Sequence, residues 1–279
     1  MNLNELFDIY LKDLKRRNVK TAARIVQFYE NDIMSVLGDR EVTDIIRGDI
    51  ASLLFDITDR SPYTSNKCLS ILKAMFNLAI TLSYLDVNPC TNIPRNREVK
   101  RKRYITNDEL LAITEQLDHL VNRKRYRKAC NFIKLLIMTG ARVGEIRNAR
   151  WSDIQDNMLV IKEHKSDRLG EDRIIHITPG VQKILDACER DSEFIIGIVS
   201  PRSVWKMISE RAGCADARLH DIRHSYASWS LQKVNLSEVG NLLGHRDVAT
   251  TQRYAHIHKE RAIENANVVS DHIESILRN

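Results

Sequence analysis

The stretch NMLVIKEHKSDRLGEDRIIHITP, residues 157–179, carries the only clear β signal in the chain. Two short apolar runs, at about 158–163 and 172–177, flank a polar turn that contains Gly170. This pattern predicts two short strands joined as a hairpin. Most of the remaining chain shows apolar residues at helical spacing. The sequence therefore predicts a mainly α fold with a small β-sheet, an α+β domain around the hairpin.

Helices are predicted on both sides of this hairpin. On the N-terminal side, Thr106 and Glu109 form a capping box, and residues 129–139 are apolar enough to form a buried helix. On the C-terminal side, helices are expected to resume near Gly180 and to continue to the end of the chain. We therefore predict a domain over residues 104–279 that ends in a tail helix.

Residues 1–88 predict a separate, all-helical domain. Ser61 followed by Pro62 is typical of a helix start, and Gly38 is expected to cap the C-terminus of an earlier helix. The helix after Ser61 carries apolar residues at helical intervals, which we interpret as a core stripe: Leu69, Leu72, Met75, Phe76 and Ala79. The domain contains no set of residues that predicts a catalytic site.

Residues 89–103 predict a linker, because prolines lie there in a polar, basic stretch. The net charge of the chain is +6, yet residues 95–150 hold 15 Lys or Arg against 6 Asp or Glu. Two runs dominate, KRKR at 100–103 and RKRYRK at 123–128. Such runs are most often solvated surface, but a basic band between near-neutral parts is also typical of polyanion binding. We interpret the band as a nucleic-acid contact.

Length and composition exclude several classes of protein. The 279 residues allow one or two domains, and contents of 43% hydrophobic and 29% charged residues are typical of a soluble globular protein. The sequence has no run of about 18 apolar residues, so it predicts no membrane span. Its start lacks the layout of a secretory signal. The five cysteines include no C-x-x-C pair, which predicts neither a zinc knuckle nor a disulfide framework and favours a reducing compartment.

Polar side chains next to apolar elements are the candidates for a functional site. The first follows the buried helix in TGARVGEIR, beside glycines that allow a ligand to approach the backbone. Others lie in the hairpin turn and in the stretches LHDIRHS, NLLGHRD and TTQRYAH. The candidate set is Arg142, Lys165, His220, Arg223, His245 and Tyr254.

These residue types fit phosphodiester cleavage without a metal ion. Two arginines can stabilise the negative charge that grows on the non-bridging oxygens. A tyrosine hydroxyl, with a reference pKa of about 10, needs a nearby base or cations to act as a nucleophile. A lysine on a hairpin can give a proton to the leaving 5′ oxygen.

Other readings of the same residues stay open. His220 and His224 lie one helical turn apart, a spacing that also suits a metal ion. Arg223, which is always protonated, would oppose a divalent cation there. Arg142 could form a structural ion pair with Glu145. His245, which follows Gly244, could be a helix-capping residue and no more.

The signatures TGARVGEI, LHDIRHSYAS and LLGHRDVATTQRYAH, together with the lysine-bearing hairpin, resemble the tyrosine recombinase (phage integrase) family. The resemblance covers nearly the whole chain. It implies that residues 1–88 form a SAM-like core-binding domain that binds DNA, and that residues 104–279 form the catalytic domain. We expect no arm-type DNA-binding domain ahead of it, because the first predicted helix starts at residue 3.

The resemblance also implies a role for each candidate. Arg142 and Arg223 are expected to clamp the scissile phosphate. Lys165 is expected to be the general acid for the leaving 5′-hydroxyl, with Lys162 as the alternative on the same hairpin. Tyr254 is expected to be the nucleophile that forms a 3′-phosphotyrosyl bond.

The histidines and one glutamate complete the implied site. His220 is expected to assist proton transfer to and from the nucleophile, and His245 to donate a hydrogen bond to the phosphate. Glu145 is expected to support the active site, whereas His224 is expected only to brace its helix.

The implied function is a site-specific DNA recombinase or integrase that cleaves and rejoins DNA without metal, ATP or other cofactor. Its implied partners are double-stranded DNA, a homotetramer on paired sites formed by exchange of C-terminal tails, and accessory DNA-bending proteins, with no membrane. A tail helix that packs on its own domain is the alternative to tail exchange. We expect a cytoplasmic protein of a bacterium or phage.

Three other functions are compatible with parts of the pattern. A type IB topoisomerase shares the implied chemistry, a metal-dependent nuclease could use His220 and His224, and a DNA-binding regulator could keep the fold without the activity. The target site and the direction of the reaction are not specified by the sequence.

Overall fold

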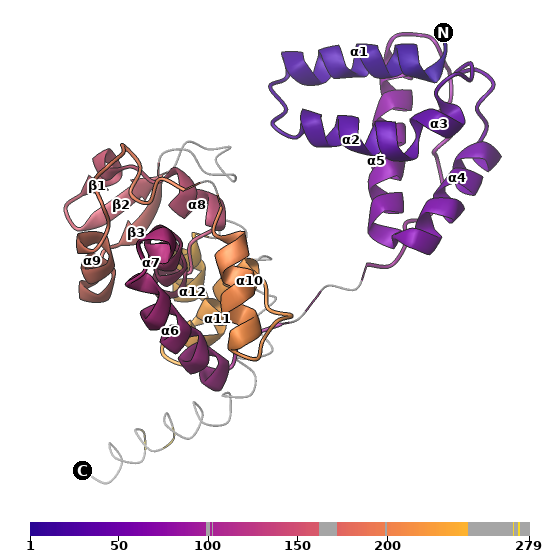
Figure 1. Cartoon of the computed structure of the whole chain (residues 1–279). Helices are drawn as coiled ribbons and strands as arrows, with labels where there is room; N and C mark the ends of the chain where they lie inside the picture. Colours follow the sequence, from indigo (N-terminus) through magenta and orange to yellow (C-terminus); the bar gives the residue numbers. More distant parts are fainter. Residues whose placement is uncertain are drawn as a thin grey trace. The chain divides into compact units, whose positions relative to one another are not determined.

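The fold is described from a computed structural model of the chain (Figure 1). The structure describes residues 1–98, 101, 103–161, 172–198, 200–244, 270 and 273. The chain divides into two compact units, unit 1 at Met1–Arg101 and unit 2 at Lys102–Asn279. Each unit has its own hydrophobic core.

Unit 1 consists of helices packed around α5 (Pro62–Thr81). Helices α1 (Leu3–Arg16), α2 (Ala22–Asp32) and α4 (Arg47–Arg60) each contact α5, which runs across α1 and α2 at a steep angle (Figure 1). The short helix α3 (Met34–Leu37) packs on α2. The predicted core stripe on α5 is confirmed, because all its residues are buried: Leu69, Leu72, Met75, Phe76 and Ala79.

The helix ends of unit 1 confirm one predicted cap and refine another. Ser61 accepts a hydrogen bond from the backbone N–H of Thr64 at 3.2 Å, and Pro62 is the first residue of α5. Gly38 caps the short helix α3, with a right-handed φ of −56°. A Cβ atom at Gly38 would lie 2.6 Å from Oδ1 of Asn4. The glycine is therefore required by the close approach of α1 and not by a left-handed turn.

The chain that follows α5 stays packed on unit 1. Cys90 is buried, and the backbone N–H of Asn96 donates to Oδ1 of Asn66 at 2.8 Å. The side chain of Asn66 donates in turn to Oε1 of Glu98 at 2.7 Å. These contacts hold the first part of the stretch 89–103 against α5.

Unit 2 is organised around α7 (Lys124–Thr139). This helix contacts α6 (Asn107–Val121), α9 (Pro179–Asp186), α10 (Arg202–Arg211) and α11 (Leu219–Ser230). Its buried residues begin at Ala129 and end at Thr139, which confirms the predicted buried helix. The capping box at the start of α6 is also confirmed, because Thr106 accepts from the backbone N–H of Glu109 and the Glu109 side chain accepts from that of Thr106.

The predicted strands are present as β2 (Met158–Ile161) and β3 (Arg173–His176), which pair antiparallel with Leu159 opposite Ile175. A strand that the sequence analysis missed, β1 (Ile154–Gln155), pairs antiparallel with β2. The turn between β1 and β2 holds Asp156 and Asn157 at φ values of 46° and 61°. Two consecutive positive φ values are typical of the tight turns that join hairpin strands.

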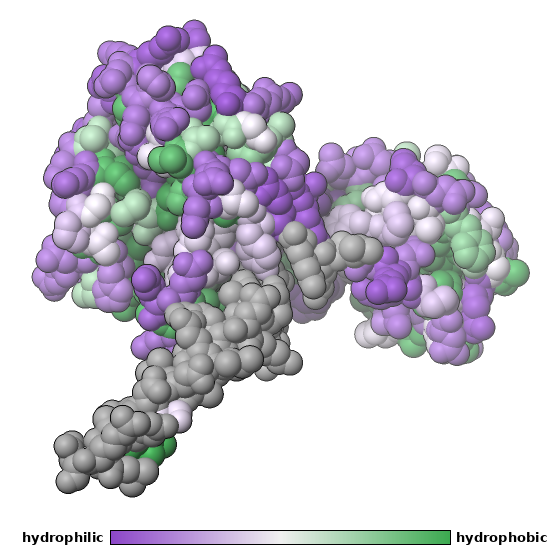
Figure 2. Space-filling view, turned by 90° about the horizontal axis from the view of Figure 1, so that it is seen from below, coloured by the Kyte–Doolittle hydropathy of each residue, from purple (hydrophilic) through white to green (hydrophobic). Residues whose placement is uncertain are grey.

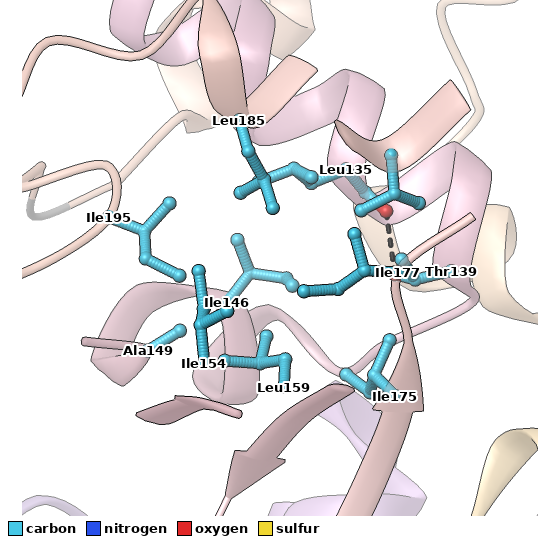
Figure 3. Close-up of a pocket in the computed structure, with 11 residues that line it drawn as sticks. Leu135, Thr139, Ile146, Ala149, Ile154, Leu159, Ile175, Ile177, Leu185 and Ile195 are labelled. Atoms are coloured by element: carbon cyan, nitrogen blue, oxygen red, sulfur yellow. Dashed lines mark hydrogen bonds between the residues drawn. The ribbon is translucent and has the colours of Figure 1, made fainter. Parts of the chain in front are cut away.

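The space between the sheet and its covering helices is apolar and nearly filled. A cavity of about 10 Å³ remains there, lined by side chains of α7, α9 and the strands (Figure 3). The polar side chain in the wall, Thr139, donates to the carbonyl of Leu135 at 2.6 Å. A cavity this small and apolar is a packing gap, not a ligand site.

The next features are the hydropathy of the surface and the length of the apolar helices. On the face drawn in Figure 2, hydrophilic residues dominate and apolar patches interrupt them on each unit. Among the described residues, no helix is both long and apolar enough to cross a membrane.

Candidate active site

Arg142 lies in the turn between α7 and α8 (Val143–Asn148). Helix α7 ends at Gly140, whose φ of 59° is left-handed, and a Cβ atom there would lie 2.5 Å from Cδ1 of Tyr226. Arg142 is the N-cap of α8. Glu145 accepts the backbone N–H of Arg142 at 2.8 Å and its guanidinium Nη1 at 2.6 Å. The ion pair considered as the structural alternative therefore exists, and it orients a guanidinium that stays partly exposed at 25%.

Arg223 lies on α11 and is buried, with 4% of its surface exposed. Its Nη1 donates to the carbonyl of Gly140 at 2.8 Å, and its Nη2 donates to the carbonyl of Leu243 at 2.7 Å. Leu243 is the last residue of α12 (Leu236–Leu243). Arg223 therefore binds the backbone at the end of α7 and at the end of α12.

The bonds of Arg223 bring the sequence signatures together. Gly140 precedes Arg142 by two residues, and consecutive Cα atoms lie only about 3.8 Å apart. The backbone next to Arg142 is therefore within hydrogen-bond distance of the Arg223 guanidinium. The same guanidinium reaches the end of α12, which precedes His245 in the sequence. Arg223, which lies in the second signature, thus contacts one residue of the first signature and one of the third.

His220 and His224 lie one turn apart on α11. Their ring centroids are 4.7 Å apart and the ring planes meet at 81°, an edge-on contact. His220 is exposed and His224 is half-buried. Within the described ranges, no group of three His, Cys, Asp or Glu residues is close enough to hold a metal ion. The metal-site alternative therefore finds no third protein ligand in this part of the chain.

Arg173 on β3 is a buried cation that the sequence analysis missed. It is 4% exposed, and its Nη2 donates to the carbonyl of Leu242 in α12 at 2.5 Å. Its Nη1 donates to the carbonyl of Ile174 in β3 at 2.5 Å and, at 3.5 Å, to that of Asn241 in α12. Burial lowers the pKa of Arg173, while the carboxylate of Glu145 acts against this shift and Arg142 adds to it. The missed signal is a charged residue at an inward-facing position of a strand, since the burial along β3 alternates from Arg173 onward.

Three candidates lie outside the described residues: Lys165, His245 and Tyr254. The alternative general acid, Lys162, lies outside them as well. Their assignment stays a prediction from the sequence. The structure places the Arg223 guanidinium on the carbonyl of Gly140, two residues before Arg142, and carries His220 on the same helix as Arg223.

The predicted basic band is partly neutralised by ion pairs within unit 2. Arg103 pairs with Glu109 at 2.6 Å and with Asp216 at 2.9 Å. The bond from Arg103 lowers the pKa of Glu109, an effect that burial opposes. In the second run, Arg127 pairs with Glu189 at 3.2 Å and Lys128 with Asp191 at 2.6 Å. These arginine and lysine side chains therefore serve the fold of unit 2.

Comparison with known proteins agrees with the architecture. The model of the phage integrase family matches residues 103–261, and that of the phage integrase central domain matches residues 5–96. A tyrosine recombinase of Thermosipho africanus is 28% identical, over 91% of this chain and 94% of that protein. The tyrosine recombinase XerA of Saccharolobus solfataricus is 29% identical, over 63% of this chain and 59% of that protein.

Solved structures show the same fold. A crystal structure of a lambda integrase dimer bound to a COC′ core site superposes with a TM-score of 0.74 at 22% identity, over 90% of this chain and 97% of that chain. A Tn1549 transposon integrase bound to transposon right end DNA superposes with a TM-score of 0.68 at 16% identity, over 94% of this chain and 100% of that chain.

A helical unit followed by an α+β unit, with two arginine signatures joined in space, defines an enzyme of the tyrosine recombinase class. More particularly, the chain belongs to the phage integrase family, whose two models together match most of its length.

Proposed function

We propose that the chain is a site-specific recombinase that cleaves and rejoins double-stranded DNA through a 3′-phosphotyrosyl intermediate, without metal or ATP. The observation that carries the proposal is the fork of Arg223, which joins the carbonyls of Gly140 and Leu243. It links the phosphate-binding signatures to the element that leads to the nucleophile. Such a link is what a preorganised phosphate site needs, because cations held in place lose no energy to reorganisation during the reaction.

Each candidate has a role in this proposal. Arg142, oriented by Glu145, and Arg223 stabilise the charge on the non-bridging oxygens of the scissile phosphate. His245 adds a hydrogen bond to the same phosphate. His220 accepts the proton of the Tyr254 hydroxyl and returns it during rejoining.

The cleavage step balances without an external reagent. The Tyr254 oxygen forms a bond to phosphorus, the bond from phosphorus to the 5′ oxygen breaks, and Lys165 gives its proton to that oxygen. Rejoining reverses these events when a 5′-hydroxyl attacks the phosphotyrosyl bond. The number of phosphoester bonds does not change, so no ATP is required.

Unit 1 offers a surface for the DNA duplex. Helix α2, the end of α4 and the start of α5 line a groove of about 340 Å³, in which Arg60 is paired with Asp32. The side chains that line it are Arg24, Gln27, Phe28, Asn31, Asp32, Arg60, Tyr63 and Thr64. Arginine and lysine hold phosphates, whereas Gln and Asn side chains can read base edges. We assign residues 1–88 to DNA binding, residues 89–103 to a basic linker and residues 104–279 to catalysis.

The solved relatives suggest the form in which the chain acts. One is a lambda integrase dimer bound to a core site, and another is a lambda integrase tetramer bound to a Holliday junction. By analogy, this chain forms a homotetramer on paired DNA sites through exchange of C-terminal tails, with accessory DNA-bending proteins as further partners. It acts in the cytoplasm of a bacterial host.

A trapping experiment tests the proposal. The wild-type chain is incubated with a nicked suicide duplex carrying the sequence it selects from a randomised duplex pool, and covalent adducts are separated on a denaturing gel. Tyr254→Phe should abolish the adduct and leave DNA affinity within about twofold, because only the nucleophilic oxygen is removed. Tyr84→Phe, which changes an exposed tyrosine of unit 1, is the matched control and should cleave like wild type.

The outcome that contradicts the proposal is equally concrete. If Tyr254→Phe still forms an adduct, another tyrosine is the nucleophile. If the wild-type chain binds the duplex but exchanges no strands between two such sites, the chain is a DNA-binding regulator or a topoisomerase and not a recombinase.

A further inference from the structure

The end of α12 is held by two arginines from different elements. Arg223 of α11 donates to the carbonyl of Leu243, and Arg173 of β3 donates to the carbonyls of Leu242 and Asn241. The last carbonyls of a helix have no partner within the helix, and cations stabilise this negative end of its dipole. Both arginines thus bind the last turn of α12.

Gly244 is fitted to the side chain of Arg173. It follows Leu243 as the C-cap of α12, with a left-handed φ of 63°. A Cβ atom at Gly244 would lie 2.6 Å from Nε and 3.1 Å from Cζ of Arg173. The backbone at the end of α12 therefore lies directly against the guanidinium, and any larger residue at 244 would displace one or the other.

Arg173 is a buried cation that is held by backbone carbonyls. The described residues form no ion pair with it, and its Nε, although buried, has no hydrogen-bond partner among them. Glu145, which lies close enough to influence it, is paired with Arg142. Burial of a guanidinium without a carboxylate is costly. A hydrophobic residue at this inward-facing strand position would pack without that cost, so stability of the sheet does not account for the arginine.

We propose that Arg173 is a positioning residue for DNA cleavage, which fixes the end of α12 and thereby the point from which the segment with His245 and Tyr254 continues. The proposal rests on the proposed function, because it assigns Arg173 to the nucleophile side of that reaction. Arg173 also begins β3, the strand that follows the hairpin with Lys165 in the sequence. The test therefore distinguishes an effect on the nucleophile from an effect on the leaving group.

The test combines Arg173→Lys with a leaving group that needs no proton. A lysine keeps the charge but cannot span two carbonyls with a planar fork. Cleavage of the suicide duplex should fall on the order of 10- to 100-fold, the effect of a misplacement of about 1 Å, with DNA affinity within about twofold. A duplex with sulfur as the bridging 5′ atom should not restore the rate, because its thiolate leaves without a general acid. The same duplex should restore Lys165→Ala.

Control variants separate positioning from folding. Arg147→Lys changes an arginine that also buries an unpartnered Nε but, among the described residues, makes no bond to α12, and it should cleave like wild type. Gly244→Ala disturbs the same contact from the other side. The double variant Gly244→Ala, Arg173→Lys should lose much less rate than the product of the two single losses, as expected for residues in contact.

Several results would overturn the inference. Cleavage by Arg173→Lys at the wild-type rate would do so, as would a loss that matches the fraction of unfolded protein or a loss that the sulfur duplex restores. A wild-type chain that forms no adduct with either duplex would instead contradict the proposed function, so the two failures are distinguishable.

Discussion

Arg173 and Arg223 are the arginines that the described part of the chain buries, and both donate to backbone carbonyls. Carbonyl partners leave the positive charge of a guanidinium intact, whereas a paired carboxylate would cancel it. The two carbonyl bonds of Arg223 fix the position of its guanidinium. Arg142 is different, because its partner Glu145 is an acid and one terminal nitrogen is engaged in that pair.

Two glycines of the first signature should respond in opposite ways to alanine. Gly140→Ala should lower the free energy of unfolding of unit 2 by about 1–3 kcal/mol, because φ is 59° and the new Cβ would lie against Tyr226. Gly144→Ala should be neutral or stabilise by up to about 1 kcal/mol, because it is helical and no atom lies within 4 Å of its Cβ position. Urea unfolding of both variants measures this; equal stabilities would contradict the described turn.

At this scale, spacing and residue type predicted Arg142, His220 and Arg223 as candidates, and the structure joins the two arginine signatures. Arg173 was not predicted. Arg173 stands out as a charged residue on the inward face of a strand. That face is known only once the pairing of Arg173 with Ile161 is known.

Arg103 belongs to the basic run that we interpreted from the sequence as a nucleic-acid contact, but it stabilises the start of helix α6. Arg103 precedes the capping box of α6 and binds both Glu109 and Asp216, so it ties the start of α6 to the loop before α11. At its position the guanidinium is only 18% exposed. The run at 100–103 is therefore not uniform: at least one of its members belongs to the fold.

A pair of variants separates the two uses of that run. Arg103→Ala should lower the melting temperature of unit 2 while leaving the dependence of DNA affinity on salt unchanged. Lys100→Ala combined with Lys102→Ala should flatten that dependence by roughly 0.9 for each phosphate that the protein no longer neutralises. Binding isotherms at several salt concentrations give the slopes. A flatter slope for Arg103→Ala with an unchanged melting temperature would contradict this division.

Elements with strong signals were predicted well, and a short one was missed. The capping box of α6, the proline start of α5 and the strands β2 and β3 follow from their sequence patterns. Strand β1 has only two residues, too few to show an alternation, and its turn uses Asp156 and Asn157 without the usual glycine. Its pairing depends on tertiary contacts that a local pattern does not contain.

In the described part of the chain, unit 1 has one core and unit 2 has a main core and a smaller cluster between α11 and α12. Phe76 is fully buried in the core of unit 1. Phe76→Ala should therefore destabilise unit 1 by about 3–5 kcal/mol and leave unit 2 unaffected. Calorimetry of the full chain should show one transition moving to lower temperature and another staying in place. A single transition that shifts as a whole would mean that the units unfold together.

The proposed function requires that this chain attach itself to DNA through one tyrosine. The most direct measurement is to trap the adduct on the suicide duplex in EDTA, digest it with trypsin and nuclease, and identify the nucleotide-bearing peptide by mass spectrometry. We expect a 3′-phosphate ester on Tyr254. An ester on any other residue, or cleaved DNA with no peptide attached, would contradict it.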